Sequence, residues 1–355
     1  MDNRERIINT CLCKQTDRPP FFFYFGPWDE TISRWRSEGL QGDWRDYFGF
    51  DPGIIHVNVN LGYQPWFESA LLEDKKETQI VRTHQGITAE IRKDGGSIPN
   101  YLDYPVKDRA SWLKLKERLN PENPDRFPPN WSEEVKKYNN GDSAVQLGCY
   151  PYGLFGTLRD MMGVEKLLIS FYDEPDLVRE MMDYLTDFWL NIFENVCADV
   201  RVDLIHIWED MSGKTGPLIS PAMIREFMLP NYKKIKDFAN KHKIRAISLD
   251  TDGNCTKLIP LFMEAGINLL LPFEVAAGSD IVSYRTQYPS LAIMGGIDKR
   301  EIAKGKEAID RELKRISPMF DYPGYFPALD HLVHPEISWE DFQYFVYRLK
   351  EMIFK

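Results

Sequence analysis

The chain has 355 residues, 43% hydrophobic and 28% charged, so a globular protein with a large buried core is expected. Its 54 acidic residues outnumber its 44 basic ones, which argues against a nucleic-acid-binding protein. Five scattered cysteines do not predict a disulfide framework. No apolar run approaches the roughly 20 residues of a membrane span, and no signal peptide is evident. The sequence predicts a cytoplasmic protein that binds neither nucleic acid nor membrane.

Short apolar runs recur along the chain and predict strands. Most are continuous rather than alternating, which is typical of parallel strands buried on both faces. The eight runs are Phe21–Phe25, Ile54–Asn60, Ala144–Cys149, Leu204–Trp208, Arg245–Leu249, Asn268–Phe273, Leu291–Gly295 and Tyr325–Leu329.

Segments with helical periodicity lie between most of these runs. They include a long amphipathic helix over Asp173–Ala198, a helix begun by Ser220 and Pro221, and a helix capped by Ser338. The alternation predicts an α/β fold, a (β/α)8 TIM barrel spanning residues 1–355 as one domain. A doubly wound sheet is the rival, but no Gly-x-Gly-x-x-Gly follows the first run.

The stretch from about residue 61 to 140 interrupts this alternation, between the second and third predicted strands. Within it, Thr78–Lys93 alternates around His84-Gln85-Gly86 and predicts an accessory β-hairpin. Such a hairpin could close over the mouth of the barrel.

Polar residues follow most of the predicted strands, at the barrel end where the chemistry of this fold lies. They are Asn58 and Asn60, Glu209 and Asp210, Asp250 and Asp252, Glu274, Asp298, and Asp330 with His331. A single carboxylate there is usually a helix cap, but five consecutive strand ends carry one. Crowded carboxylates raise one another's pKa, so the cluster is expected to hold a proton for general acid catalysis or to bind a cation.

Histidines and aromatic residues also lie in or near the predicted strand ends. His331 beside Asp330 is suited to proton transfer, whereas His56 and His206 lie inside strands and are expected to be packed core residues. Aromatic residues after strands could wall a pocket, namely Trp28, Tyr63, Trp66, Tyr150 and Tyr152. Motifs for a phosphate loop, a zinc-protease helix and a serine-hydrolase elbow are lacking.

Several segments resemble the uroporphyrinogen decarboxylase superfamily. They are the opening MDNRERIINTCLCKQTDRPP, residues 206–235, the Asp-Gly-Asn stretch at 252–254, MGGIDKREIAKG and the closing YFPALDHLVHPEISWEDF. The resemblance spans nearly the whole chain and implies a TIM barrel. It also implies one of two activities, cofactor-free decarboxylation of uroporphyrinogen or zinc-dependent methyl transfer between corrinoid proteins and thiols.

The decarboxylase pattern is altered in this chain. Its substrate-binding arginines fall on residues 24–29, which contain no arginine, its central aspartate on Asn58, a serine on Asp210 and its histidine on His331. We therefore expect decarboxylase-type chemistry on an organic acid other than a porphyrinogen, without a cofactor. Asp210, Asp250 and His331 would be the acids and bases, and Asn58 would orient the substrate. The expected substrate contacts are Phe25, Trp28, Tyr150, Tyr152, Glu209 and Glu274.

The methyltransferase pattern is altered too. The positions of its zinc ligands fall on Asp250, Asp252 and Asp330, and three carboxylates favour magnesium or manganese, although zinc also accepts them. A divalent ion, a shared proton or an intervening lysine or arginine could each offset the repulsion within this triad, and we slightly favour the metal. A corrinoid protein would then be the partner. The remaining alternative for the function is a non-catalytic barrel that binds a small ligand. The partner could also be a second copy of the chain, as a homodimer.

Overall fold

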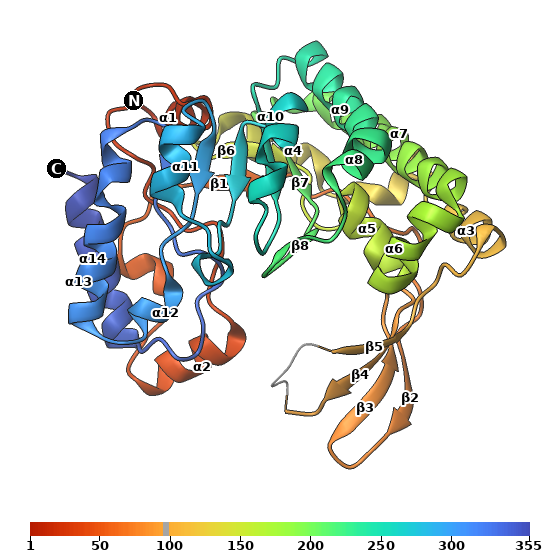
Figure 1. Cartoon of the computed structure of the whole chain (residues 1–355), viewed down its shortest axis with the longest axis horizontal. Helices are drawn as coiled ribbons and strands as arrows, with labels where there is room; N and C mark the ends of the chain where they lie inside the picture. Colours follow the sequence, from red (N-terminus) through yellow and green to blue (C-terminus); the bar gives the residue numbers. More distant parts are fainter. Residues whose placement is uncertain (95–98) are drawn as a thin grey trace.

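The computed structural model describes residues 1–94 and 99–355 and confirms the α/β barrel. Seven parallel strands pair in chain order around a curled sheet (Figure 1). They are β1 (Ile54–His56), β6 (Ala144–Leu147), β7 (Leu204–Trp208), β10 (Ala246–Asp250), β11 (Leu269–Leu271), β12 (Ala292–Met294) and β13 (Tyr325–Phe326). Each overlaps a predicted run, so all eight runs except the first form strands.

The first predicted strand, Phe21–Phe25, is not a strand. This segment lies between β13 and β1, because the Phe22 ring approaches Phe326 and the Tyr24 ring approaches His56. Among the residues that the structure describes, it joins no strand ladder, and the nearby bridge connects Pro27, two residues beyond the segment, to Val333. Proline has no N–H to donate. In this run of five aromatic residues, Phe22 and Tyr24 turn into the barrel, whereas Phe23 packs outward against Phe342 and Phe345. The segment therefore occupies the place of a strand without a continuous ladder.

Helices cover the outside of the barrel. Those after the strands are α2 (Asp29–Ser37), α5 (Leu154–Met162), α6 (Val164–Asp173), α7 (Pro175–Asp199), α8 (Pro221–Met223), α9 (Leu229–Lys241), α10 (Ile259–Glu264), α11 (Ile281–Gln287), α12 (Lys299–Ile302), α13 (Lys306–Ile316) and α14 (Trp339–Ile353). The predicted caps are confirmed, since Ser220 accepts from the Met223 amide and Ser338 from the Asp341 amide. A π-helical turn, Ile224–Met228, joins α8 to α9. Among the described residues, no helix is both long and apolar enough to cross a membrane.

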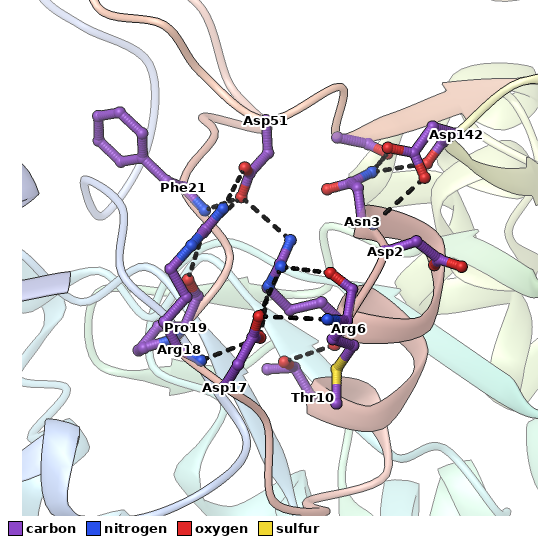
Figure 2. A network of polar contacts seen from close by, with 12 residues as sticks. Asp2, Asn3, Arg6, Thr10, Asp17, Arg18, Pro19, Phe21, Asp51 and Asp142 are labelled. Atoms are coloured by element: carbon purple, nitrogen blue, oxygen red, sulfur yellow. Dashed lines mark hydrogen bonds and ion pairs between the residues drawn. The ribbon is translucent and has the colours of Figure 1, made fainter. Parts of the chain in front are cut away.

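Helix α1 (Asn3–Cys11) closes the amino-terminal end of the barrel. Ile7 and Cys11 are buried in one cluster with the first residues of several strands. Figure 2 shows the polar network around this helix, in which Arg6 pairs with Asp17 at 2.9 Å and Arg18 with Asp51 at 2.6 Å. With this end occupied by side chains, the carboxyl ends of the strands are left to form a site.

The insertion is confirmed and is larger than a hairpin. The predicted hairpin is the centre of a four-stranded antiparallel sheet, hereafter the accessory sheet. Its strands are β2 (Ala70–Asp74), β3 (Thr78–Arg82), β4 (Thr88–Arg92) and β5 (Asn100–Asp103), followed by α3 (Arg109–Lys116) and α4 (Trp131–Asn140). Figure 1 shows this sheet projecting away from the barrel rather than lying across its mouth.

Candidate active site

Asp250 and Asp252 lie at the carboxyl end of β10, in the centre of the strand-end cluster. Asp250 is buried, and burial together with Asp252, Asp210 and Glu274 raises its pKa well above the usual value. Burial, together with Asp210 and Glu274, raises the pKa of Asp252 to about 7. The structure thus brings these carboxylates together, and at neutral pH Asp252 is close to its titration point.

His331 faces Asp252 from the far side of the mouth. Its Nε2 lies 3.4 Å from Asp252 Oδ1, and that oxygen has no hydrogen bond from the residues that the structure describes. Burial, followed by the charge of Lys299, lowers the pKa of His331 to about 4, so the imidazole is neutral at pH 7. A neutral imidazole beside a carboxyl group with a pKa near 7 is suited to passing a proton to a bound molecule.

Asp210, which follows β7, is held by an arginine. Arg159 on α5 donates from Nη1 to the Asp210 carbonyl at 2.9 Å and to its carboxylate at 2.5 Å, and its guanidinium lies over the Trp208 ring. Asp210 has a left-handed backbone with φ of 43°, which is unfavourable for a residue with a side chain. The ion pair fixes both the strained backbone and the side chain at the edge of the cluster.

Lys299 lies between two other strand ends. Its ammonium is 3.5 Å from Glu274 and 3.7 Å from Asp330. Asp330 is fully buried and also accepts from the backbone amides of Val275 and Lys299, while Glu274 accepts from the Gly253 amide. Burial still raises the pKa of Asp330 despite the nearby ammonium. An intervening lysine therefore offsets the repulsion on this side of the cluster.

The three carboxylates expected to hold a metal do not form a ligand set that fits one. Both oxygens of Asp330 accept backbone hydrogen bonds, and Lys299 already supplies the nearby positive charge. Throughout residues 1–94 and 99–355, no three His, Cys, Asp or Glu side chains are arranged to hold a metal ion. Asp252 is among the neighbours that raise the pKa of Asp250, and partial protonation of Asp252, whose pKa is about 7, reduces the negative charge of the pair.

Two of the aromatic residues expected to contact substrate, Phe25 and Trp28, lie beside His331 and His334 respectively. The Phe25 ring is 5.0 Å from the His331 ring, and the ring of Trp28, which is 37% exposed, lies 5.0 Å from the His334 ring at a tilt of 40°. Asn58 and Tyr150 instead line a groove of about 550 Å³ beside the mouth. The structure thus places Asn58 with Tyr150 rather than with the carboxylates.

Two expected substrate contacts are wrong. Glu209 is fully buried and accepts from the first three amides of α5 and from the Tyr232 hydroxyl at 2.7 Å. It caps α5 from the neighbouring strand, and burial raises its pKa to about 7. Tyr152 is buried against Trp189 and Phe193. Sequence position near a strand end could not show that both side chains turn outward into the helix layer.

A polar layer below the carboxylates was missed by the sequence analysis. Gln146 Nε2 lies 3.0 Å from both the Tyr24 hydroxyl and His56 Nδ1, and His206 Nδ1 lies 2.9 Å from the Ser248 hydroxyl. His56 is exposed, in contrast with the packed core position expected for it. Although part of the His56 side chain reaches solvent, the surrounding protein still desolvates its ring enough to lower its pKa. Burial, with His56 nearby, lowers the pKa of His206 to about 3.

The available signal was the strand period of two. Ser248 precedes Asp250 by two positions and His206 precedes Asp210 by four, so both are expected to face the same way as those carboxylates. Asp298, another strand-end carboxylate, has a structural role rather than a place in the cluster, because it caps α12 and pairs with Arg300.

Comparison with known proteins gives a family and a fold. The family model described as uroporphyrinogen decarboxylase matches residues 84–352. A solved methyltransferase from Methanosarcina mazei is similar with a TM-score of 0.56 and 12% identity, covering 99% of each chain, which supports the fold alone. A B12-independent methionine synthase from Shewanella sp. W3-18-1 has a TM-score of 0.39 and 10% identity over 79% of this chain and 74% of its own, too remote for argument. No curated protein matches this chain.

Proposed function

Because the chain belongs to the uroporphyrinogen decarboxylase family, we propose that it is an enzyme that decarboxylates a small organic acid by acid–base catalysis. The observation that carries the proposal is the pair formed by Asp252 and His331, a carboxyl group with a pKa of about 7 and a neutral imidazole 3.4 Å away. General acids work best when their pKa lies near the working pH. No bound metal is required for this chemistry.

In the proposed step, the bond between the substrate carbon and its carboxylate breaks and CO2 leaves. The electron pair of that bond remains on the carbon, which takes the proton of Asp252, so the product carries hydrogen where the carboxylate was. Asp252 is then an anion and regains a proton from solvent, with His331 beside it to relay that proton.

The charges at the mouth argue for a substrate with few negative charges. Arg159 is already paired with Asp210, and Lys299 with Glu274 and Asp330, so neither cation is free for additional carboxylates. A tetrapyrrole with eight carboxylates would meet an acidic surface and be repelled. An anaerobic assay with uroporphyrinogen is therefore expected to give negligible coproporphyrinogen, and robust turnover would contradict the assignment of the charges.

The direct experiment is a screen of small mono- and dicarboxylic acids in D2O, with CO2 release measured and C–D bond formation followed by NMR. Asp252→Asn is expected to lower the rate on any substrate found by at least about 100-fold, the usual contribution of a general acid. Asp237→Asn, which changes an exposed carboxylate on α9, is the matched control. Full activity of Asp252→Asn would refute the assigned acid.

Methyl transfer is the second candidate, because the similar structure named a methyltransferase aligns along the whole chain. A corrinoid protein would then be the partner. Incubation with methylcobalamin and a panel of thiol, amine and hydroxyl acceptors, followed by the absorbance change on loss of the methyl group, separates the two candidates. Demethylation without CO2 release from any acid would favour methyl transfer.

A further inference from the structure

A second hollow in the surface lies between the accessory sheet and α3, away from the strand-end carboxylates. This groove has a volume of about 470 Å³. Its walls include Phe67, Tyr104 and Leu115, so part of its lining is apolar. Four basic side chains also line it, Arg82 from β3, Lys107 before α3, Lys114 on α3 and Arg118 after it.

Three of these four cations have no carboxylate partner among the residues that the structure describes. Lys107 pairs with Asp103. Arg82, by contrast, donates to the carbonyl of Glu68 at 3.0 Å, and Arg118 donates to the carbonyl of Pro65 at 2.8 Å. Lys114 is exposed, and its ammonium makes neither an ion pair nor a hydrogen bond within residues 1–94 and 99–355. Like charges gathered in one groove repel one another, and an anion would relieve that repulsion.

The concentration of positive charge is notable because the chain as a whole has a formal charge of −10. A local basic hollow in an acidic protein attracts anions to one place on its surface. Arg118 is also oriented, since its guanidinium lies 4.3 Å from the centre of the Phe67 ring. An oriented guanidinium can present paired donors to a phosphate or carboxylate group.

We propose that this groove is a binding site for a small organic anion with at least two negative charges and an apolar portion. The charged end would lie among Arg82, Lys114 and Arg118, and the apolar portion against Phe67 and Leu115. The volume is within the range of about 300–1,000 Å³ that is common for small-molecule pockets. This site is independent of the chemistry proposed for the barrel mouth.

The test is isothermal titration calorimetry on the full chain at low ionic strength, with inorganic pyrophosphate and citrate as probes. One-to-one binding that weakens with added NaCl is expected for at least one of them, and the stronger of the two tells whether phosphate or carboxylate is the preferred group. Lys114→Ala and Arg82→Ala should each weaken binding by about fivefold, the factor given by one contact between unit charges in water.

Lys233→Ala, which removes an exposed lysine on α9, is the control and should bind as the unaltered protein does. The melting temperature of each variant without probe shows that it is folded. No binding of either probe would overturn the proposal. Binding that Lys114→Ala and Arg82→Ala leave unchanged, or that Lys233→Ala weakens equally, would overturn it as well.

Discussion

Replacement of Lys299 by methionine tests the charge balance at the barrel mouth most directly. Methionine keeps much of the side-chain volume but removes the ammonium that lies 3.5 Å from Glu274 and 3.7 Å from Asp330. At an effective dielectric of 20, each of these contacts amounts to about 4–5 kcal/mol before the cost of burying the lysine is subtracted. Removal of one partner from a buried ion pair typically costs about 3–5 kcal/mol, and we expect a loss of about 3 kcal/mol at pH 8 because Glu274 is partly exposed.

The pH dependence gives the experiment its second readout. Without the ammonium, the pKa of buried Asp330 rises further above that of the unfolded chain, so the folded variant binds a proton more readily than the unfolded chain does. The deficit of Lys299→Met should therefore be largest at pH 8 and shrink at pH 5.5. Urea unfolding at the two pH values measures it, with the exposed Lys233→Met as control. A loss below about 1 kcal/mol at both pH values would refute the reasoning.

Three further predictions concern neighbouring groups. The pKa of Asp252 is about 7 in the folded protein, above its value in the unfolded chain. The contribution of Asp252 to the free energy of unfolding therefore falls as pH rises from about 4 to 7. Asp252→Asn should flatten this part of the pH profile measured by urea unfolding. An unchanged slope would contradict the raised pKa. Tyr232→Phe removes a buried hydrogen bond of 2.7 Å to Glu209 and should lower the free energy of unfolding by about 1–2 kcal/mol, which chemical denaturation measures; no loss would contradict the role of Glu209 as a buried acceptor. Both carboxylate oxygens of Asp330 already accept backbone hydrogen bonds. The melting temperature should therefore not change with EDTA or with added magnesium, manganese or zinc. A higher melting temperature with any of these ions would contradict this prediction and support a metal site.

The fold could be predicted from the sequence because most of the buried parallel strands are nearly continuous apolar runs, and such runs are visible without structure. The exception at Phe21–Phe25 has a physical reason, since an aromatic, apolar run shows burial but not whether its backbone pairs with a neighbour. Pro19, Pro20 and Pro27 around it were the available warning.

The candidate site was predicted in part, because strand ends converge in a barrel whatever the side chains are. Asp250, Asp252, Asp330 and His331 are brought to one end in this way. The direction of a side chain just beyond a strand is not fixed by its position, which is why Glu209 was misplaced. The partner of a carboxylate is also invisible when it is distant in sequence, as Lys299 is from Glu274.

The segment that replaces the first strand makes the barrel a ring with a seam. Between β13 and β1, side-chain packing and isolated hydrogen bonds hold the ring together, whereas β7 and β10 share five paired positions. Backbone amides along residues 21–27 should exchange with solvent through small local openings, well before those of β7 and β10. Tyr24 and Phe25 belong to this seam. Tyr24 also contacts the polar layer below the carboxylates, and Phe25 contacts His331. The part of the wall nearest the proposed chemistry is thus the part that can open without unfolding the rest of the barrel.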